Sequence, residues 1–221
     1  MKRHALSTRI WHWLNFGCLV ILFMSGLNIS NAHPRLYWGE WGFEAADAWL
    51  FLPRFPGWMT IPSHYSLAAA RDWHVLTAWV FALALLAYMI AALVNRHFQR
   101  DIATTRDEWR GEAIRRDIRE HLRLNFDARG RKYNFLQKTS YSLVIFVLLP
   151  LMIVTGMAIS PGMDAAWPFL TEIFGGRQSA RSIHFLCAWA LVAFLVVHVV
   201  LVMLSGPARQ LRDMIIGGSE R

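Results

Sequence analysis

The chain has 221 residues, of which 55% are hydrophobic, and its mean hydropathy is +0.30. Its formal net charge is +8, but the basic residues stand between long apolar runs and form no single clustered face, so nucleic-acid binding is not expected. The two cysteines, Cys18 and Cys187, both lie in apolar runs and argue against a disulfide framework.

Four apolar runs are each about 20 residues long, the length at which a helix spans a bilayer. None of them contains Asp, Glu, Lys or Arg, which argues against a soluble all-α protein with buried helices. The first run lacks a small-residue cleavage site and carries Trp11, His12 and Asn15, so a cleaved signal peptide is not expected. The predicted spans are Ile10–Ile29, Trp73–Val94, Tyr141–Ile159 and Ile183–Leu204.

Lysine and arginine predict the orientation of these spans, because cytoplasmic loops carry an excess of both. Eighteen of the 23 lie before the first span, in the 95–138 loop or after the last span. We therefore expect both termini and the 95–138 loop in the cytoplasm, and the 31–72 and 160–182 loops in the periplasm. This predicts a multi-pass protein of the bacterial inner membrane.

The two long loops differ in character. The 31–72 loop is rich in aromatic residues, which either anchor it at the membrane surface or form a docking face for a periplasmic partner. Within it, Phe43–Leu52 is expected to form a short interfacial helix. In the cytoplasmic loop, Thr105–Leu124 has one apolar stripe, which predicts an amphipathic helix on the inner leaflet, with a solvated connector as the alternative.

The four spans resemble two copies of a helix pair. Residues 24–30 (MSGLNIS) end the first span, and residues 154–160 (VTGMAIS) end the third. Residues 71–74 (RDWH) and 181–184 (RSIH) open the second and the fourth. Gly26 and Gly156 would allow a helix or a flat cofactor to approach closely, although ordinary helix packing explains them as well.

Four histidines, His12, His74, His184 and His198, lie in the predicted spans, where ionisable side chains are rare and are functional by default. His198 follows His184 by fourteen residues, about 21 Å of helical rise, and returns close to the same face. The expected orientation pairs His74 with His184 near the periplasmic surface, and His12 with His198 near the cytoplasmic surface. Two axial imidazoles saturate a haem iron, which suits electron transfer. The pattern predicts two bis-histidine b-type haems.

Other chemistry fits the four histidines less well. Zinc would need further ligands, but the pairs lie at two depths and no carboxylate or thiolate joins them. A proton relay would include Asp or Glu within the spans, and there is none. The chain also has no C-x-x-C-H motif, so any haem would be held without a covalent bond.

An arginine precedes three of these histidines by three residues. Arg9, Arg71 and Arg181 each share a helix face with the following histidine and lie nearer the membrane surface. A guanidinium pairs well with a carboxylate, so the three arginines are candidates for binding haem propionates. For Arg9, flanking of a span by positive charge is the alternative.

The histidine pattern and three phrases are similar to a known family. The phrases are residues 31–39 (NAHPRLYWG), 132–138 (KYNFLQK) and 176–185 (GRQSARSIHF). Over nearly the whole chain the sequence resembles the di-haem cytochrome b membrane subunits of bacterial respiratory oxidoreductases. Those of formate dehydrogenase and nickel–iron hydrogenase belong to this family, and the thiosulfate reductase type looks most similar.

The resemblance implies a quinone site and a partner. Asn134, Gln137 and Lys138 match the stretch that helps to form the quinone site near the cytoplasmic haem, with helix capping by Asn134 as the alternative. Family members normally work with a periplasmic redox subunit, often a molybdopterin oxidoreductase. Residues 1–221 are expected to form a single di-haem domain, an all-α integral membrane protein whose four-transmembrane-helix bundle contains the haems.

The leading hypothesis is transmembrane electron transfer between a periplasmic oxidoreductase and the membrane quinone pool. The first alternative is a standalone di-haem oxidase of a small periplasmic species such as superoxide, with quinone as its acceptor. The second is a haem-free anchor or transporter. The sequence leaves open whether the chain is itself an enzyme, the direction of electron flow, the quinone type and the oligomeric state, a homodimer included.

Overall fold

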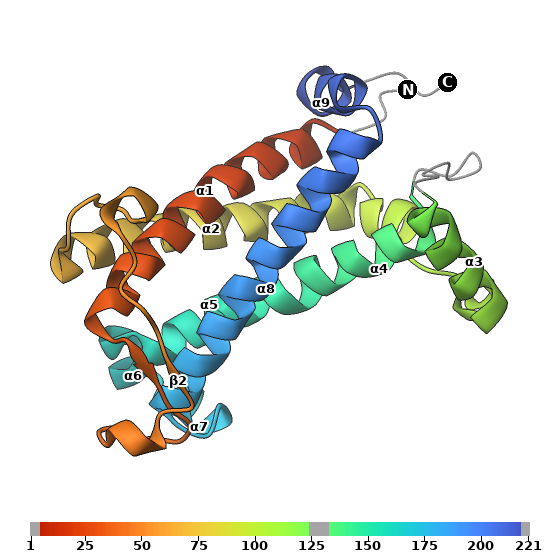
Figure 1. Ribbon diagram of the computed structural model, residues 1–221. Coiled ribbons are helices and arrows are strands. Elements are labelled where there is room, and N and C mark those ends of the chain that lie inside the picture. The colour runs from red at the N-terminus through yellow and green to blue at the C-terminus, as the bar shows by residue number, and fades with distance from the viewer. Residues whose placement is uncertain (1–4, 124–132, 218–221) are drawn as a thin grey trace. The chain divides into compact units, whose positions relative to one another are not determined.

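The computed structural model describes residues 5–123 and 133–217, and these residues are almost entirely helical (Figure 1). The charges of Lys2, Arg3, Arg221 and the 124–132 segment, which contributed to the predicted orientation, lie outside the described residues. Four helices are long and apolar enough to cross a membrane, which confirms the predicted all-α membrane protein with four spans. They are α1 (Leu6–Ala32), α2 (Leu67–Val94), α4 with α5 (Phe135–Leu143 and Leu149–Ile159) and α8 (Arg177–Leu204).

The outward side chains of these helices are apolar. On α2, for example, Leu83, Ile90 and Val94 are 61%, 54% and 76% exposed. Surface of this kind is stable only against lipid or another apolar partner, so exposure on α2 agrees with a membrane-spanning helix.

The third span is longer than predicted and is not a uniform α-helix. It begins at Phe135 instead of Tyr141, and a π-helical turn covers Val144–Leu148 between α4 and α5. Pro150 explains this turn, because proline lacks an N–H and its ring clashes with the carbonyl four residues earlier, that of Phe146. A π turn lets the helix continue past such a residue.

Two compact units make up the described residues. The smaller unit comprises residues 5–11, 86–149 and 191–217, and the larger unit comprises residues 12–85 and 150–190. Each of the four long helices contributes residues to both units.

In the larger unit, the 33–66 connection contains short elements only. The expected helix over Phe43–Leu52 is wrong, since a 3₁₀ turn covers Ala45–Asp47 and the strand β2 (Leu50–Phe51) then pairs antiparallel with β1 (Arg35–Leu36). Backbone pairing with β1 therefore replaces helical hydrogen bonds in this stretch. A second 3₁₀ turn covers Gly57–Met59, and two short helices, α6 (Pro161–Ala166) and α7 (Phe169–Ile173), join α5 to α8.

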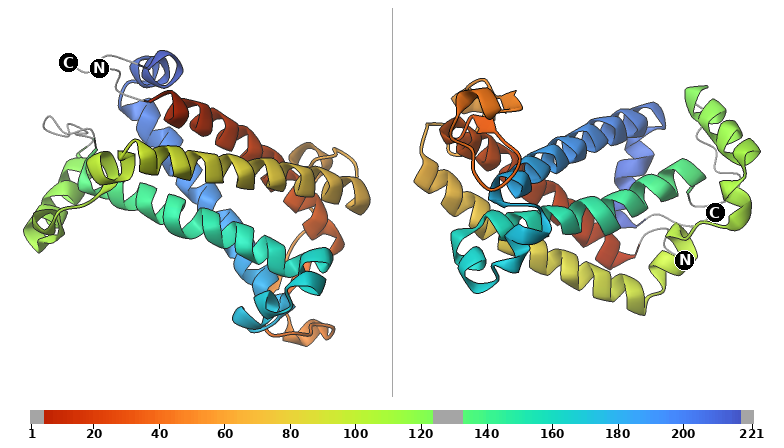
Figure 2. Two further views of the ribbon diagram at one scale, coloured as in Figure 1. Left: turned by 180° about the vertical axis from the view of Figure 1, so that it is seen from behind. Right: turned by 90° about the horizontal axis from the view of Figure 1, so that it is seen from below.

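In the smaller unit, the expected helix over Thr105–Leu124 is divided. A 3₁₀ turn covers Arg106–Trp109, and Arg110 is extended before α3 (Gly111–Leu122) begins. The carboxylate of Asp117 on α3 accepts a hydrogen bond from the backbone N–H of Leu136 at 2.9 Å, which ties α3 to the first turn of α4 (Figure 2). A π turn over Phe98–Ile102 follows α2, and α9 (Pro207–Ile216) follows α8.

Candidate functional site

Two of the four predicted ligands, His74 on α2 and His184 on α8, face each other within the larger unit. Their ring centres are 6.2 Å apart and the ring planes are inclined by 60°. A metal–imidazole bond of about 2.0 Å places each ring centre roughly 3 Å from the metal, so two imidazoles on opposite sides of one ion have centres about 6 Å apart. The observed separation therefore fits a single metal ion held between the two rings.

Each of the two rings has a hydroxyl at Nδ1. Ser25 Oγ on α1 lies 2.9 Å from His74 Nδ1, and Thr155 Oγ1 on α5 lies 2.9 Å from His184 Nδ1. With Nδ1 engaged, Nε2 is the nitrogen that each ring can offer to a metal. The sequence reasoning gave no role to Ser25 or Thr155, although both occupy the same place in the internal repeat.

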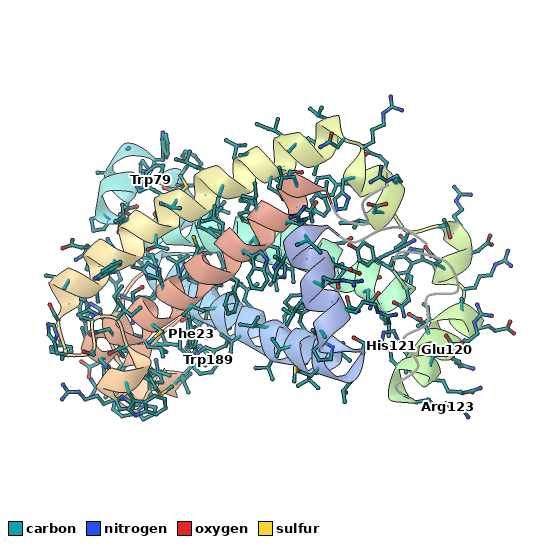
Figure 3. The ribbon with its side chains drawn as sticks, turned by 90° about the horizontal axis from the view of Figure 1, so that it is seen from above. Phe23, Trp79, Glu120, His121, Arg123 and Trp189 are labelled. Atoms are coloured by element: carbon teal, nitrogen blue, oxygen red, sulfur yellow. The ribbon has the colours of Figure 1, made fainter. Side chains whose placement is uncertain are left out.

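The residue after each hydroxyl is a glycine that lies against the same ring. A Cβ on Gly26 would stand 3.6 Å from His74 Cε1, and a Cβ on Gly156 would stand 3.4 Å from His184 Cε1. Both ligand rings are thus held in the same way by the two copies of the repeat. Phe23 on α1 and Trp189 on α8 also pack edge to face, with ring centres 5.2 Å apart. Figure 3 shows these two side chains next to each other.

The chemistry of the surroundings favours haem over a bare ion. Among residues 5–123 and 133–217, no group of three or more His, Cys, Asp or Glu could hold a metal ion. A zinc site needs at least three protein ligands. An iron whose four equatorial ligands come from a porphyrin needs only two, and His74 and His184 supply that number.

Two of the predicted propionate-binding arginines lie in the larger unit with this histidine pair. Arg71 is exposed, whereas Arg181 is partly buried and donates a hydrogen bond from Nη2 to the carbonyl of Arg35. Arg181 Nε is buried and has no hydrogen-bond partner among the described residues. A buried cationic N–H without an acceptor is costly, so this donor is suited to an anionic ligand group.

The positive charges of both arginines affect the pKa of His33. Partial burial, then the charge of Arg181 and then that of Arg71 lower the pKa of His33 below its ordinary value of 6.5, although much of the residue is exposed to solvent. The sequence alone assigns no role to His33, and only its place in the 31–39 phrase could have singled it out. Arg71 and Arg181 make this region positive, and the lowered pKa of His33 keeps its imidazole neutral near pH 7.

We expect the stability of the protein to fall in mild acid because of His33. Its pKa is lower in the folded chain, so the unfolded chain binds more protons as the pH falls through about 6.5. His33→Gln should lessen the decrease in the melting temperature between pH 7.5 and pH 5.5, modestly because His33 is exposed, and should leave it unchanged at pH 8. Parallel melting curves of variant and wild type at all pH values would contradict this role.

The 33–66 connection is fixed to the first turns of α8, the helix that carries His184. The carbonyl of Gly39 accepts hydrogen bonds from Gln178 N at 3.0 Å and Ser179 N at 3.2 Å, which satisfies free N–H groups at the start of the helix. Ser182 Oγ donates to the Tyr37 carbonyl at 2.6 Å and accepts from Trp49 Nε1 at 3.0 Å. These contacts position the loop against the helix close to His184.

Gly176 makes this close approach possible. Its φ is +112°, and a Cβ there would stand 2.5 Å from the carbonyl carbon of Gly39. We expect Gly176→Ala to destabilise the fold by about 1–3 kcal/mol through backbone strain, and further through the clash. Gly175→Ala is the matched control, because Gly175 also has a positive φ, +70°, but open space around it. Thermal melts in detergent should show the larger loss for Gly176→Ala; equal losses would contradict the clash.

The other two predicted ligands belong to different units. His12, in the larger unit, has its ring 5.1 Å from that of Trp13 and nearly perpendicular to it. His198, in the smaller unit, stacks on Phe194 with ring centres 5.8 Å apart and planes inclined by 15°. The structure thus places each ring among aromatic neighbours, and their pairing rests on the sequence argument.

The remaining predicted residues, all in the smaller unit, have partners within the protein. Arg9 donates a hydrogen bond to the carbonyl of Ile215 on α9. Asn134 is the N-cap residue of α4, and Gln137 Oε1 accepts from its backbone N–H at 3.2 Å. Lys138 Nζ lies 3.0 Å from Glu108 Oε1 and 3.3 Å from the carbonyl of Ala103. A quinone bound through Gln137 or Lys138 would have to share or replace these contacts.

Comparisons with known proteins give matches along nearly the whole chain. The family model described as prokaryotic cytochrome b561 matches residues 3–217. A protein of Azospira oryzae, described as a putative protein-methionine-sulfoxide reductase subunit, YedZ1, is 27% identical over 213 residues, which cover 91% of this chain and 90% of that protein. Probable Ni/Fe-hydrogenase B-type cytochrome subunits of Cupriavidus necator and Azotobacter vinelandii are 24% and 26% identical, cover 89% and 87% of this chain, and are each covered to 76%.

Proposed function

Because the chain belongs to the prokaryotic cytochrome b561 family, a family of haem-b membrane cytochromes that transfer electrons, we propose that it carries two bis-histidine haems. His74 and His184 would hold one haem, and His12 and His198 the other. The observation that carries the proposal is the 6.2 Å separation of the His74 and His184 rings, with a hydroxyl at the Nδ1 of each.

The residues around the first haem suit electron transfer. A bound haem would supply a one-electron ferric–ferrous couple, and His74 and His184 would both hold its iron, which suits electron transfer rather than oxygen binding. Arg71 and Arg181 would bind its propionates, and the buried Nε of Arg181 supports this assignment. Arg9 is proposed for the second haem, in competition with its hydrogen bond to Ile215.

The charge of the loops supports the orientation that we propose, and the names of the relatives support a redox partner. We place the protein in the bacterial inner membrane with both termini in the cytoplasm, so that the 33–66 connection faces the periplasm. The relatives' names describe subunits of a hydrogenase and of a methionine-sulfoxide reductase. A periplasmic oxidoreductase, of the molybdopterin class in our proposal, would dock at this connection, where Trp41, Phe43 and Trp58 are 74%, 78% and 79% exposed.

At the other membrane surface we propose exchange of electrons with quinone. Amide groups can hydrogen-bond a quinone carbonyl, and Asn134 and Gln137 lie at the start of α4. Asn134 and Gln137 form a capping box at this helix start, so a quinone bound through either amide would have to share that contact. Lys138 stands one residue further along the same helix.

A second function is supported by the positive charge around the first haem. Arg71 and Arg181 would attract a small anion as well as bind propionates. Oxidation of superoxide with quinone as the acceptor would use the same two haems without a protein partner.

Purification from native membranes tests the proposal. We expect a b-type spectrum with two haems per chain by the pyridine haemochrome assay, reduction of both by a quinol, and co-purification of a periplasmic redox subunit. Superoxide-driven reduction of the haems in the isolated chain, with no co-purified subunit, would favour the second function. A preparation without haem would refute both.

A further inference from the structure

The hydroxyls of Ser25 and Thr155 belong to a matched arrangement on two different helices. Both side chains are fully buried at 0% exposure, and each is 2.9 Å from the Nδ1 of one candidate ligand. Each also donates a hydrogen bond to the backbone carbonyl four residues earlier, Ser25 to Ile21 at 2.7 Å and Thr155 to Leu151 at 2.6 Å.

This second contact determines the direction of the first. A serine or threonine hydroxyl has one proton, and here the short distance to the carbonyl assigns that proton to the backbone. The hydroxyl oxygen can then only accept from the ring, so Nδ1 carries the hydrogen in both histidines. Nε2 is left with its lone pair, which is the form of imidazole that ligates a metal.

We infer that Ser25 and Thr155 are positioning residues that hold His74 and His184 in the Nδ1–H tautomer and tune the potential of the haem between them. The inference rests on the proposed haem site. A ligand histidine with its outer N–H bonded to an acceptor is fixed in orientation and is a stronger electron donor. Stronger electron donation by the histidine stabilises the ferric state of the iron. A neutral hydroxyl acceptor stabilises this state less than a carboxylate acceptor would.

Removal of either hydroxyl is therefore expected to favour the ferrous state. Ser25→Ala and Thr155→Val should raise the midpoint potential of the haem that is absent in His74→Ala. A tenfold change in the ferric–ferrous equilibrium corresponds to about 59 mV for a one-electron couple, and we expect a shift of this order. The low-spin EPR signal of the same haem should also move, because the ring is no longer held at Nδ1.

Two further variants separate this role from general damage to the helices. Thr155→Ser keeps the hydroxyl and should retain the wild-type potential and EPR signal. Ser30→Ala removes another α1 hydroxyl, which bonds the Gly26 carbonyl at 2.9 Å and no histidine, and should also leave both unchanged. Loss of haem in Thr155→Val but not in Thr155→Ser would support the inference as well.

The opposing outcomes are distinct. Two bound haems with unchanged potentials and EPR signals in Ser25→Ala and Thr155→Val would overturn the inference and leave the proposed function standing. An equal shift in Ser30→Ala would overturn it too, because the effect would then be structural. A wild-type protein in which no haem depends on His74 would overturn both.

Discussion

Replacement of His74 or His184 by alanine is expected to remove one haem of two and to leave the other in place. The two rings flank one candidate metal position, with centres 6.2 Å apart, so loss of either leaves an iron with a single protein ligand. Replacement of His198 should remove the other haem. The measurement is haem per chain, with separate titration of each remaining haem by redox potentiometry.

The comparison between variants makes this result specific. His74→Ala and His184→Ala should have the same remaining haem, while His198→Ala should retain the one that they lose. His64→Ala is a control, because His64 lies in a loop and its side chain is exposed. Loss of both haems in every ligand variant would point to unfolding, and retention of both in His74→Ala would refute the ligand assignment.

The second large effect is expected at the ion pair between Lys138 and Glu108 in the smaller unit. Lys138 Nζ lies 3.0 Å from Glu108 Oε1, and the two side chains are only 11% and 8% exposed. Removal of one member of a buried pair costs up to about 3–5 kcal/mol. Glu108 also accepts a hydrogen bond from the backbone N–H of Thr105 at 2.8 Å, so we expect Lys138→Met to lower the free energy of unfolding by less than this upper value in chemical denaturation in detergent.

A double variant tests the origin of this loss. Lys138→Met combined with Glu108→Leu removes both charges and should recover much of the stability, because well-packed apolar side chains can replace a buried ion pair. Additive losses would show that packing, and not a stranded charge, dominates. Quinone reduction by the double variant would then show whether Lys138 also takes part in the proposed quinone site.

The sequence predicts the spans well because their signal is the length of uncharged apolar runs, and membrane helices need little else. It predicts helix ends less well. The helix α1 extends from Leu6 to Ala32 where Ile10–Ile29 was expected, because polar residues such as Ser7 and Asn31 continue the helix beyond the apolar run. The π turn before Pro150 depends on local backbone sterics, which a hydropathy pattern does not contain.

At the candidate site, the histidines were recognisable because charge-bearing residues are rare in apolar runs. Ser25 and Thr155 were not, because hydroxyls are common in membrane helices and usually bond only their own backbone. Their role depends on which helix face meets which histidine, and that follows from tertiary packing. The internal repeat contained the signal, since a hydroxyl followed by glycine recurs at Ser25–Gly26 and Thr155–Gly156.

The unbroken course of α8 has a consequence for energy conversion. His184 and His198 are fourteen residues apart on this one helix, a rise of about 21 Å in a hydrocarbon layer of about 30 Å. If the proposed haems are held at these two positions, an electron that passes between them would cross a large part of the membrane's electric field. This electron transfer step would therefore be electrogenic. Moving one elementary charge across the whole membrane changes the free energy by about 2.3 kcal/mol per 100 mV, so the membrane voltage would favour electron flow in one direction and oppose it in the other.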